Sequence, residues 1–330
     1  MSSAGKSTRA IRLVFCGTPE FAVPAFRHLF AQPDFQILAV ITQPDRARGR
    51  GGEVSFAPVK ETALAAEIPV LQPEKIRAPE AQALLEKLAP DVIVIIAYGQ
   101  IIPARLLSIP RLGWINLHAS LLPKYRGAAP INWAIVNGET ITGVTTMRID
   151  AGMDTGEMLL QKQIEIGSDE TAPKLAGRLA ELGAPLMSQT LRGLAAGTIT
   201  PRAQPNEGVS LAPILKREDG RIPWFLTALE IFNRIRGFAL WPGAFSTFRG
   251  ETCHVWGEPV SAENAAANLA TKGSTQPGTI LIHQNEACVQ CGGTTYLRLT
   301  SVKREGRRQV SVAEFLNGAH LRPGERFGET

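Results

Sequence analysis

Short apolar runs alternate with amphipathic helical patterns through residues 11–196. The runs typical of strands are Ile11–Cys16, Gln36–Ile41, Asp91–Ala97, Gly113–His118 and Gly143–Ile149. Helical patterns cover Pro19–Phe30, Pro58–Glu67, Pro79–Leu88, Ala128–Val136 and Thr171–Ala196. Pro185 is expected to kink or split the last of these helices. Strands that alternate with helices predict an α/β fold with a doubly wound, mainly parallel sheet.

The pattern changes after residue 197. Proline, glycine and polar residues over 198–212 predict a linker. Beyond it, a helical pattern at Thr227–Gly237 precedes several short strand-like pieces, which predict a small antiparallel barrel or sandwich. Of these two we expect the small C-terminal β-barrel, OB-like, over 213–330. We therefore expect a disordered lead-in over residues 1–10, a catalytic domain over 11–197, the linker, and the barrel.

Composition narrows the class of protein. A chain of 330 residues with 44% hydrophobic and 20% charged residues is typical of a soluble protein with two cores. Four cysteines are too few for a disulfide framework, which favours a reducing cytoplasm. Cys288 and Cys291 form a C-x-x-C pair in an alternating segment, which predicts opposite faces and no metal site. The net charge of +5 favours a polyanionic partner.

Candidate chemistry lies at the end of the run Gly113–His118. Asn116 and His118 share one face of the predicted strand, because residues two apart in a strand point the same way. An amide and an imidazole together can stabilise a carbonyl oxygen that becomes anionic and can move a proton. A histidine in this role needs a carboxylate, and either Asp150 or Asp154 in the following glycine-containing loop can supply it. The alternative is a buried polar pair that caps the strand.

Two other reaction classes are disfavoured. The turn after the first strand, "CGTPEFA", lacks the three glycines of a dinucleotide-binding fingerprint. No G-x-S-x-G elbow is present, so direct transfer to an incoming nucleophile is favoured over a covalent acyl-enzyme.

The stretch "NLHASLLPKYRGAAPINWAI", followed by "TGVTTMRIDAGMDTGEML", resembles the folate-dependent formyltransferases. "FCGTPEFA", "TQPDRARGRG", "APVK", "AYGQIIP" and "WPGAF" extend the resemblance over most of the chain. It implies transfer of the formyl group of 10-formyltetrahydrofolate, a cosubstrate, to the amino group of methionine on initiator methionyl-tRNA, without a metal. It also implies that Asn116, His118 and Asp154 are catalytic, with Asp150 structural. The folate-binding segment would be Ser120, Leu121, Leu122 and Pro123.

Basic residues suggest how tRNA is held. Arg46, Arg48 and Arg50 stand among glycines in one loop, and Lys124 and Arg126 follow the folate segment. The resemblance implies that this loop enters the acceptor-stem region of the tRNA. The alternative is a solvated flexible loop that binds nothing. The C-terminal domain adds a set suited to contact with the tRNA backbone: Lys216, Arg217, Arg221, Arg234, Arg236, Lys303, Arg304, Arg307 and Arg308.

Two rival functions remain open. One is formyl transfer to another amine, such as a glycinamide ribonucleotide or a nucleotide-linked amino sugar. The other is an RNA-binding protein with an inactive site, against which the intact Asn116, His118 and Asp154 argue. We expect a monomer without membrane association.

Overall fold

The computed structural model describes residues 9–48, 53–261, 276–322 and 324–328, so most of the expected lead-in lies outside the description. The chain divides into two compact units. The first runs to Pro130 and includes Ile141–Glu165 and Ala176–Ala212. The second consists of Ile131–Thr140, Ile166–Leu175 and the chain from Pro213 onward. The assignment of functional domains to 11–197 and 213–330 stays a prediction.

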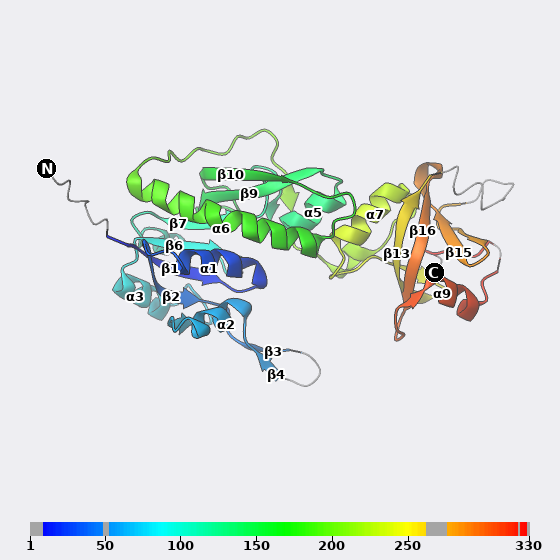
Figure 1. Ribbon diagram of the computed structural model, residues 1–330, viewed down its shortest axis with the longest axis horizontal. Coiled ribbons are helices and arrows are strands. Elements are labelled where there is room, and N and C mark those ends of the chain that lie inside the picture. The colour runs from blue at the N-terminus through cyan, green and yellow to red at the C-terminus, as the bar shows by residue number, and fades with distance from the viewer. Residues whose placement is uncertain (1–8, 49–52, 262–275, 323, 329–330) are drawn as a thin grey trace. The chain divides into compact units, whose positions relative to one another are not determined.

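The first unit is built on a seven-stranded sheet with the order β10-β9-β7-β6-β1-β2-β5 (Figure 1). Five strands are parallel: β1 (Ile11–Gly17), β2 (Phe35–Ile41), β5 (Val70–Leu71), β6 (Val92–Ile96) and β7 (Trp114–His118). β9 (Ile141–Arg148) and β10 (Met158–Glu165) are antiparallel to their neighbours. The predicted α/β fold class is confirmed. Sequence reasoning missed the edge strands β5 and β10.

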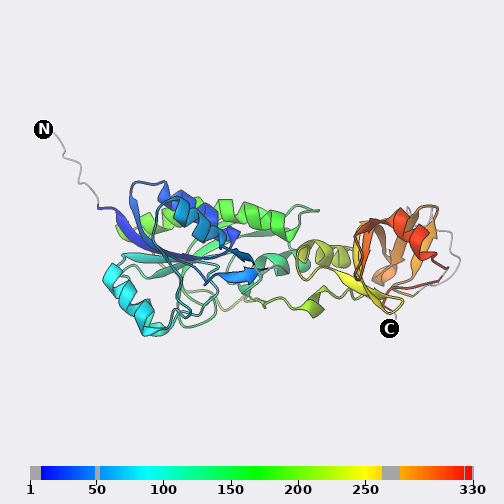
Figure 2. The same ribbon diagram turned by 90° about the horizontal axis from the view of Figure 1, so that it is seen from below.

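Helices cover both faces of this sheet (Figure 2). On one face α1 (Val23–Phe30) places Phe26 with its ring centroid 5.3 Å from that of Phe15 on β1. α6 (Ala172–Ala196) lies on the same face. On the other face, α3 (Pro79–Leu88) and the short α4 (Ala104–Leu107) pack against Val14 and Cys16. α2 (Pro58–Ala65) packs beside α1.

α6 is one continuous helix, so Pro185 does not split it, and the other expected outcome, a kink, stays a prediction. Proline removes a hydrogen bond to the carbonyl of the residue four positions earlier, here Glu181. Both residues are exposed, so water can satisfy that carbonyl. The buried face of α6 keeps its packing across the proline.

The second unit contains an antiparallel sheet with the order β12-β13-β16-β15-β14, and β17 also pairs with β16. The strands are β12 (Phe245–Phe248), β13 (Glu251–Val260), β14 (Ile280–His283), β15 (Glu286–Gln290), β16 (Tyr296–Arg304) and β17 (Val310–Ser311). Its helices include α5 (Pro130–Val136), α7 (Ala228–Gly237) and α9 (Val312–Ala319). The pairings confirm an antiparallel C-terminal sheet domain, and its closure into a barrel stays a prediction.

The core of the second unit is aromatic, with Trp224, Phe248, Phe315 and Phe327 in contact. The four cysteines of the chain are free and buried. Burial raises the pKa of the Cys288 thiol to about 11 and that of Cys291 to about 12. Within the described residues, no cluster of histidine, cysteine and acidic side chains could hold a metal ion. No helix described in the structure has the length and apolar character to cross a membrane.

Candidate active site

β7 places Asn116 and His118 on one face at its carboxyl end. The alternate residues point into opposite packing layers. Trp114 packs with α3 and α4 and donates its indole N–H to the Leu106 carbonyl at 2.8 Å. Leu117 lies so close to Gly183 of α6 that a Cβ there would be 2.4 Å from its Cδ2 atom. Strand alternation therefore fixes the common direction of the amide and the imidazole.

His118 is buried and held on both sides of its ring. Its Nε2 atom lies 2.9 Å from the carbonyl oxygen of Tyr125, which can only accept, so Nε2 carries a hydrogen. Its Nδ1 atom lies 3.6 Å from Oδ2 of Asp154. Nδ1 is thus the ring nitrogen that can take up or release a proton beside a carboxylate.

Asp154 is held in place by the chain around it. Its Oδ2 atom accepts a hydrogen bond of 2.8 Å from the Gly127 amide. Its backbone has φ 53°, in the left-handed region that aspartate tolerates better than most residues. Asp150 faces its own loop instead, where it accepts hydrogen bonds from the Gly152 amide at 3.0 Å and the Thr155 hydroxyl at 2.8 Å. These contacts fit the structural role expected for Asp150.

The carboxamide of Asn116 is half-buried, and among the described residues it has no hydrogen-bond partner. Its register partners are Ile95 on β6 and Met147 on β9, which offer apolar side chains on either side. An amide without a partner beside a histidine paired to an aspartate can donate to a substrate oxygen.

Sequence reasoning missed Gln204, which supports the aspartate loop from the segment that we expected to be a linker. Its Nε2 atom donates to the carbonyls of Asp154 at 2.7 Å and Gly156 at 2.8 Å. Its Oε1 atom accepts both Nε–H and Nη2–H of Arg126, at 3.0 and 2.7 Å. Gln204 lies among prolines and polar residues without periodicity, so no local signal marks it.

The same segment also fixes the loop after β7. β11 (Leu211–Ala212) runs parallel to β8 (Arg126–Gly127), and the Ser210 hydroxyl accepts from the Tyr125 amide at 2.9 Å. A Cβ on Gly127 would lie 2.5 Å from the Ala212 carbonyl oxygen, so only glycine fits this pairing. Residues 198–212 therefore build part of the site.

In the predicted folate segment, Ser120 and Leu122 are buried, whereas Leu121 and Pro123 are partly exposed. The Thr145 hydroxyl donates to the Ser120 carbonyl at 2.6 Å and accepts from the Leu122 amide at 3.1 Å. Gln161 donates to the Leu122 carbonyl at 2.8 Å. Thr145 and Gln161, on β9 and β10, were also missed, and they hold the backbone of this segment.

The residues predicted to bind tRNA differ in their exposure and in their contacts. Arg46 and Arg48 lie on β3 (Arg46–Arg48), which pairs with β4 (Glu53–Ser55) in a hairpin. Arg50 lies outside the described residues. Lys124 is exposed, whereas Arg126 is half-buried and bonded to Gln204. Their roles in tRNA binding stay predictions.

The basic residues expected to contact tRNA in the second unit fall into three groups. Arg236 is buried and bonds Asn233 and the Gly167 carbonyl, and Arg234 bonds the Asp219 carbonyl. Burial lowers the pKa of both guanidinium groups. Arg304 and Arg308 are in ion pairs with glutamates. Within the described residues no hydrogen bond or ion pair holds the exposed side chains of Arg217, Arg221, Lys303 and Arg307.

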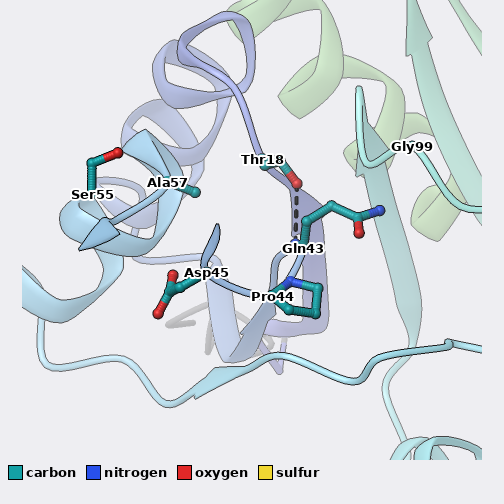
Figure 3. A pocket seen from close by; sticks show the side chains of 7 residues that line it. All are labelled: Thr18, Gln43, Pro44, Asp45, Ser55, Ala57 and Gly99. Carbon is teal, nitrogen blue, oxygen red and sulfur yellow. Dashed lines mark hydrogen bonds between the residues drawn. The ribbon is translucent and has the colours of Figure 1, made fainter. Parts of the chain in front are cut away.

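A cavity of about 360 Å³ opens at the carboxyl ends of β1, β2 and β6 (Figure 3). Its lining residues are Thr18, Gln43, Pro44, Asp45, Ser55, Ala57 and Gly99. β6 is also the neighbour of β7 in the sheet, so the cavity and Asn116 lie along the same edge. Ligands of open α/β sheets bind at this edge.

The whole arrangement suits acyl transfer to a nucleophile, and comparison with known proteins agrees with that class. Residues 11–191 match the family described as formyl transferase, and residues 214–320 match the formyl transferase C-terminal domain. The chain belongs to the formyl transferase family. Relatives that match over nearly its full length include methionyl-tRNA formyltransferases. That of Solibacter usitatus is 50% identical, covering 97% of this chain and 99% of the relative. That of Acidobacterium capsulatum is 49% identical, covering 96% and 100%.

Solved structures share the fold. WlaRD, a sugar 3N-formyl transferase, aligns with a TM-score of 0.62 at 19% identity, over 91% of this chain and 100% of that chain. The N-formyltransferase from Helicobacter canadensis aligns with a TM-score of 0.61 at 18% identity, with the same coverage. At such identities the likeness concerns the fold alone.

Proposed function

We propose that this chain transfers the formyl group of 10-formyltetrahydrofolate to the amino group of methionine on initiator methionyl-tRNA, for translation initiation. The proposal rests on two neighbouring side chains. The carboxamide of Asn116 has no hydrogen-bond partner among the described residues, and His118 beside it is paired with Asp154. The named relatives, about half identical over nearly the full length, supply the substrate.

The reaction follows from the positions of these three residues. The uncharged methionyl amine attacks the formyl carbon, and the carbonyl oxygen becomes anionic as the new C–N bond forms. The Asn116 amide donates to that oxygen. His118, through Nδ1, takes the proton that the amine loses and delivers it to the departing folate nitrogen as the old C–N bond breaks. Asp154 keeps the ring oriented and balances its charge during the transfer.

The folate cosubstrate would contact the segment Ser120, Leu121, Leu122 and Pro123. Support comes from the partial exposure of Leu121 and Pro123, and from the hydrogen bonds by which Thr145 and Gln161 fix this backbone. A rigid loop presents its exposed side chains in one geometry, which lowers the entropy lost on binding. The proposed chemistry uses no metal.

The tRNA would be held by the arginine hairpin, with Arg46, Arg48 and Arg50, by Lys124 and Arg126, and by the exposed basic residues of the second unit. The net charge of +5 supports a polyanionic substrate. We further propose that the protein is a cytoplasmic monomer, in keeping with its four unpaired thiols. Light scattering on the purified chain tests the monomer.

The decisive experiment is incubation with 10-formyltetrahydrofolate and charged initiator tRNA, with formylmethionine as the readout. Parallel reactions contain glycinamide ribonucleotide or a nucleotide-linked amino sugar as the amine. We expect turnover with the charged tRNA and none with the other amines. Turnover of either small amine in place of the tRNA would reject the proposal. His118→Ala serves as the inactive control.

A further inference from the structure

The hairpin of β3 and β4 has no strand partner in the main sheet among the described residues. A two-stranded hairpin alone is marginally stable in water, so its position depends on what holds its ends. Asp45 directly precedes β3, and Phe56 directly follows β4. We call these two the base residues of the hairpin.

Lys60, in the first turns of α2, contacts both base residues. Its Nζ atom forms an ion pair with Oδ2 of Asp45 and lies 4.1 Å from the centroid of the Phe56 ring. The same atom donates to Oε1 of Gln72 at 2.7 Å. The side chains of Lys60 and Asp45 are 12% and 21% exposed, so their ion pair is partly shielded from water, whereas Phe56 is an exposed residue.

Gln72 completes the arrangement from the end of β5. Its Nε2 atom donates to the Gln43 carbonyl at 2.8 Å and to Oδ1 of Asp45 at 3.0 Å. The hydrogen bonds from Lys60 and Gln72 lower the pKa of Asp45, which therefore stays ionised. Lys60, Asp45, Gln72 and Phe56 are called the Lys60 cluster below.

The Lys60 cluster borders the cavity at the sheet edge. Asp45, Ser55 and Ala57 line the cavity from the hairpin base and the start of α2, and Thr18 and Gly99 line it from the ends of β1 and β6 (Figure 3). The ammonium group of Lys60 thus contacts both base residues of the hairpin, and one of them, Asp45, lines the cavity.

We propose that Lys60 is a positioning residue that fixes the hairpin base, and with it the cavity that receives the aminoacylated 3′ end of the tRNA. The substrate in this inference rests on the proposed function. A neutral side chain cannot replace Lys60, because it would leave Asp45 without its cation and Phe56 without the charge above its ring. Arginine keeps both interactions in altered geometry.

The test compares Lys60→Met and Lys60→Arg with wild type and with Lys87→Met, a matched control at an exposed position on α3. Steady-state formylation is measured separately against methionyl-tRNA and against 10-formyltetrahydrofolate. For Lys60→Met we expect the KM for tRNA to rise about tenfold, with kcat and the KM for folate little changed. Lys60→Arg should recover part of the loss, and Lys87→Met should match wild type.

Limited trypsin digestion gives a readout that does not depend on the substrate. Cleavage after Arg46 and Arg48 should become severalfold faster in Lys60→Met and remain unchanged in Lys87→Met. If Lys60→Met does not fold, Phe56→Leu removes the ring alone and should show the same effects at smaller size. An unchanged KM for tRNA, or equal rises in both KM values, would overturn the inference. A wild-type enzyme inactive on methionyl-tRNA would instead refute the proposed function, and the digestion would still test the positioning.

Discussion

Nδ1 of His118 lies 3.6 Å from Oδ2 of Asp154, and the same carboxylate oxygen accepts the Gly127 amide at 2.8 Å. One carboxylate therefore joins the end of β7, the loop after it and the loop after β9. Two residues here have left-handed backbones, Tyr125 with φ 61° and Asp154 with φ 53°. Non-glycine residues hold this conformation at a cost of about 1–3 kcal/mol, and only where surrounding contacts enforce it. The geometry at His118 is thus maintained by the structure around it.

Replacing Asp154 with asparagine tests the charge of this carboxylate. The asparagine side chain would keep an oxygen for the Gly127 amide but place no charge beside His118. We expect formyl transfer in single turnover to fall by about a hundredfold or more, with circular dichroism unchanged. Near-wild-type turnover by Asp154→Asn would assign Asp154 to loop structure alone.

Asn116→Ala removes the proposed donor to the oxyanion. Loss of one such donor lowers kcat by about a hundredfold to a thousandfold. Because the carboxamide has no hydrogen-bond partner among the described residues, the variant should keep its melting temperature and its affinity for tRNA. A large drop in melting temperature would indicate that Asn116 acts in the structure instead. His118→Ala should lower the rate comparably.

Gln204→Leu tests the support of the aspartate loop. The substitution leaves the carbonyls of Asp154 and Gly156 and the guanidinium of Arg126 without their partner. We expect kcat to fall about tenfold or more, since small displacements of catalytic groups are costly, with little change in the KM for tRNA. Arg126→Ala distinguishes support of the aspartate loop from tRNA binding. A fall in kcat would show that Arg126 supports the loop, and a rise in the KM for tRNA would show that it binds the substrate.

The basic residues of the second unit should not contribute equally to tRNA affinity. Burial lowers the pKa of His254, and the charges of Lys303 and Arg217 lower it further, so these cations lie near one ring. The double variant Arg217→Ala, Lys303→Ala should bind tRNA more weakly. The slope of log K against log salt concentration should become less steep by about one unit for each phosphate that is no longer neutralised. Arg304→Ala with Arg308→Ala, residues already paired with glutamates, is the control and should change the slope less.

Arg192 on α6 donates to both carboxylate oxygens of Asp34, at 2.6 and 2.9 Å, and lowers the pKa of that carboxyl. A lowered folded-state pKa adds stability above the unfolded pKa of about 3.9, and this stability is lost as pH falls through the folded value. Both side chains are about two-fifths exposed, so we expect no more than about 1 kcal/mol. Asp34→Asn should therefore unfold more easily than wild type at pH 7, and the difference should shrink below about pH 4. Urea titrations at both pH values measure it, and a constant difference would contradict the assignment.

Much of the fold could be predicted from local patterns. The five expected strands of the first unit correspond to β1, β2, β6, β7 and β9. The edge strand β10 was missed because its residues are mostly half-buried or exposed, without an apolar run. α9 was missed although Ser311 and Glu314 form a capping box, a signal present in the sequence.

The amino-acid sequence by itself determined which residues stand together on one strand. Period-two alternation put Asn116 and His118 on one face, because that relation is local. Only the tertiary structure decided which distant groups meet them. From the residues alone Asp150 and Asp154 were equivalent, and the fold turns Asp154 toward His118 while Asp150 caps its own loop. Gln204 and Lys60 likewise act through contacts between segments far apart in the chain, which the packing of the sheet brings together and no local periodicity encodes.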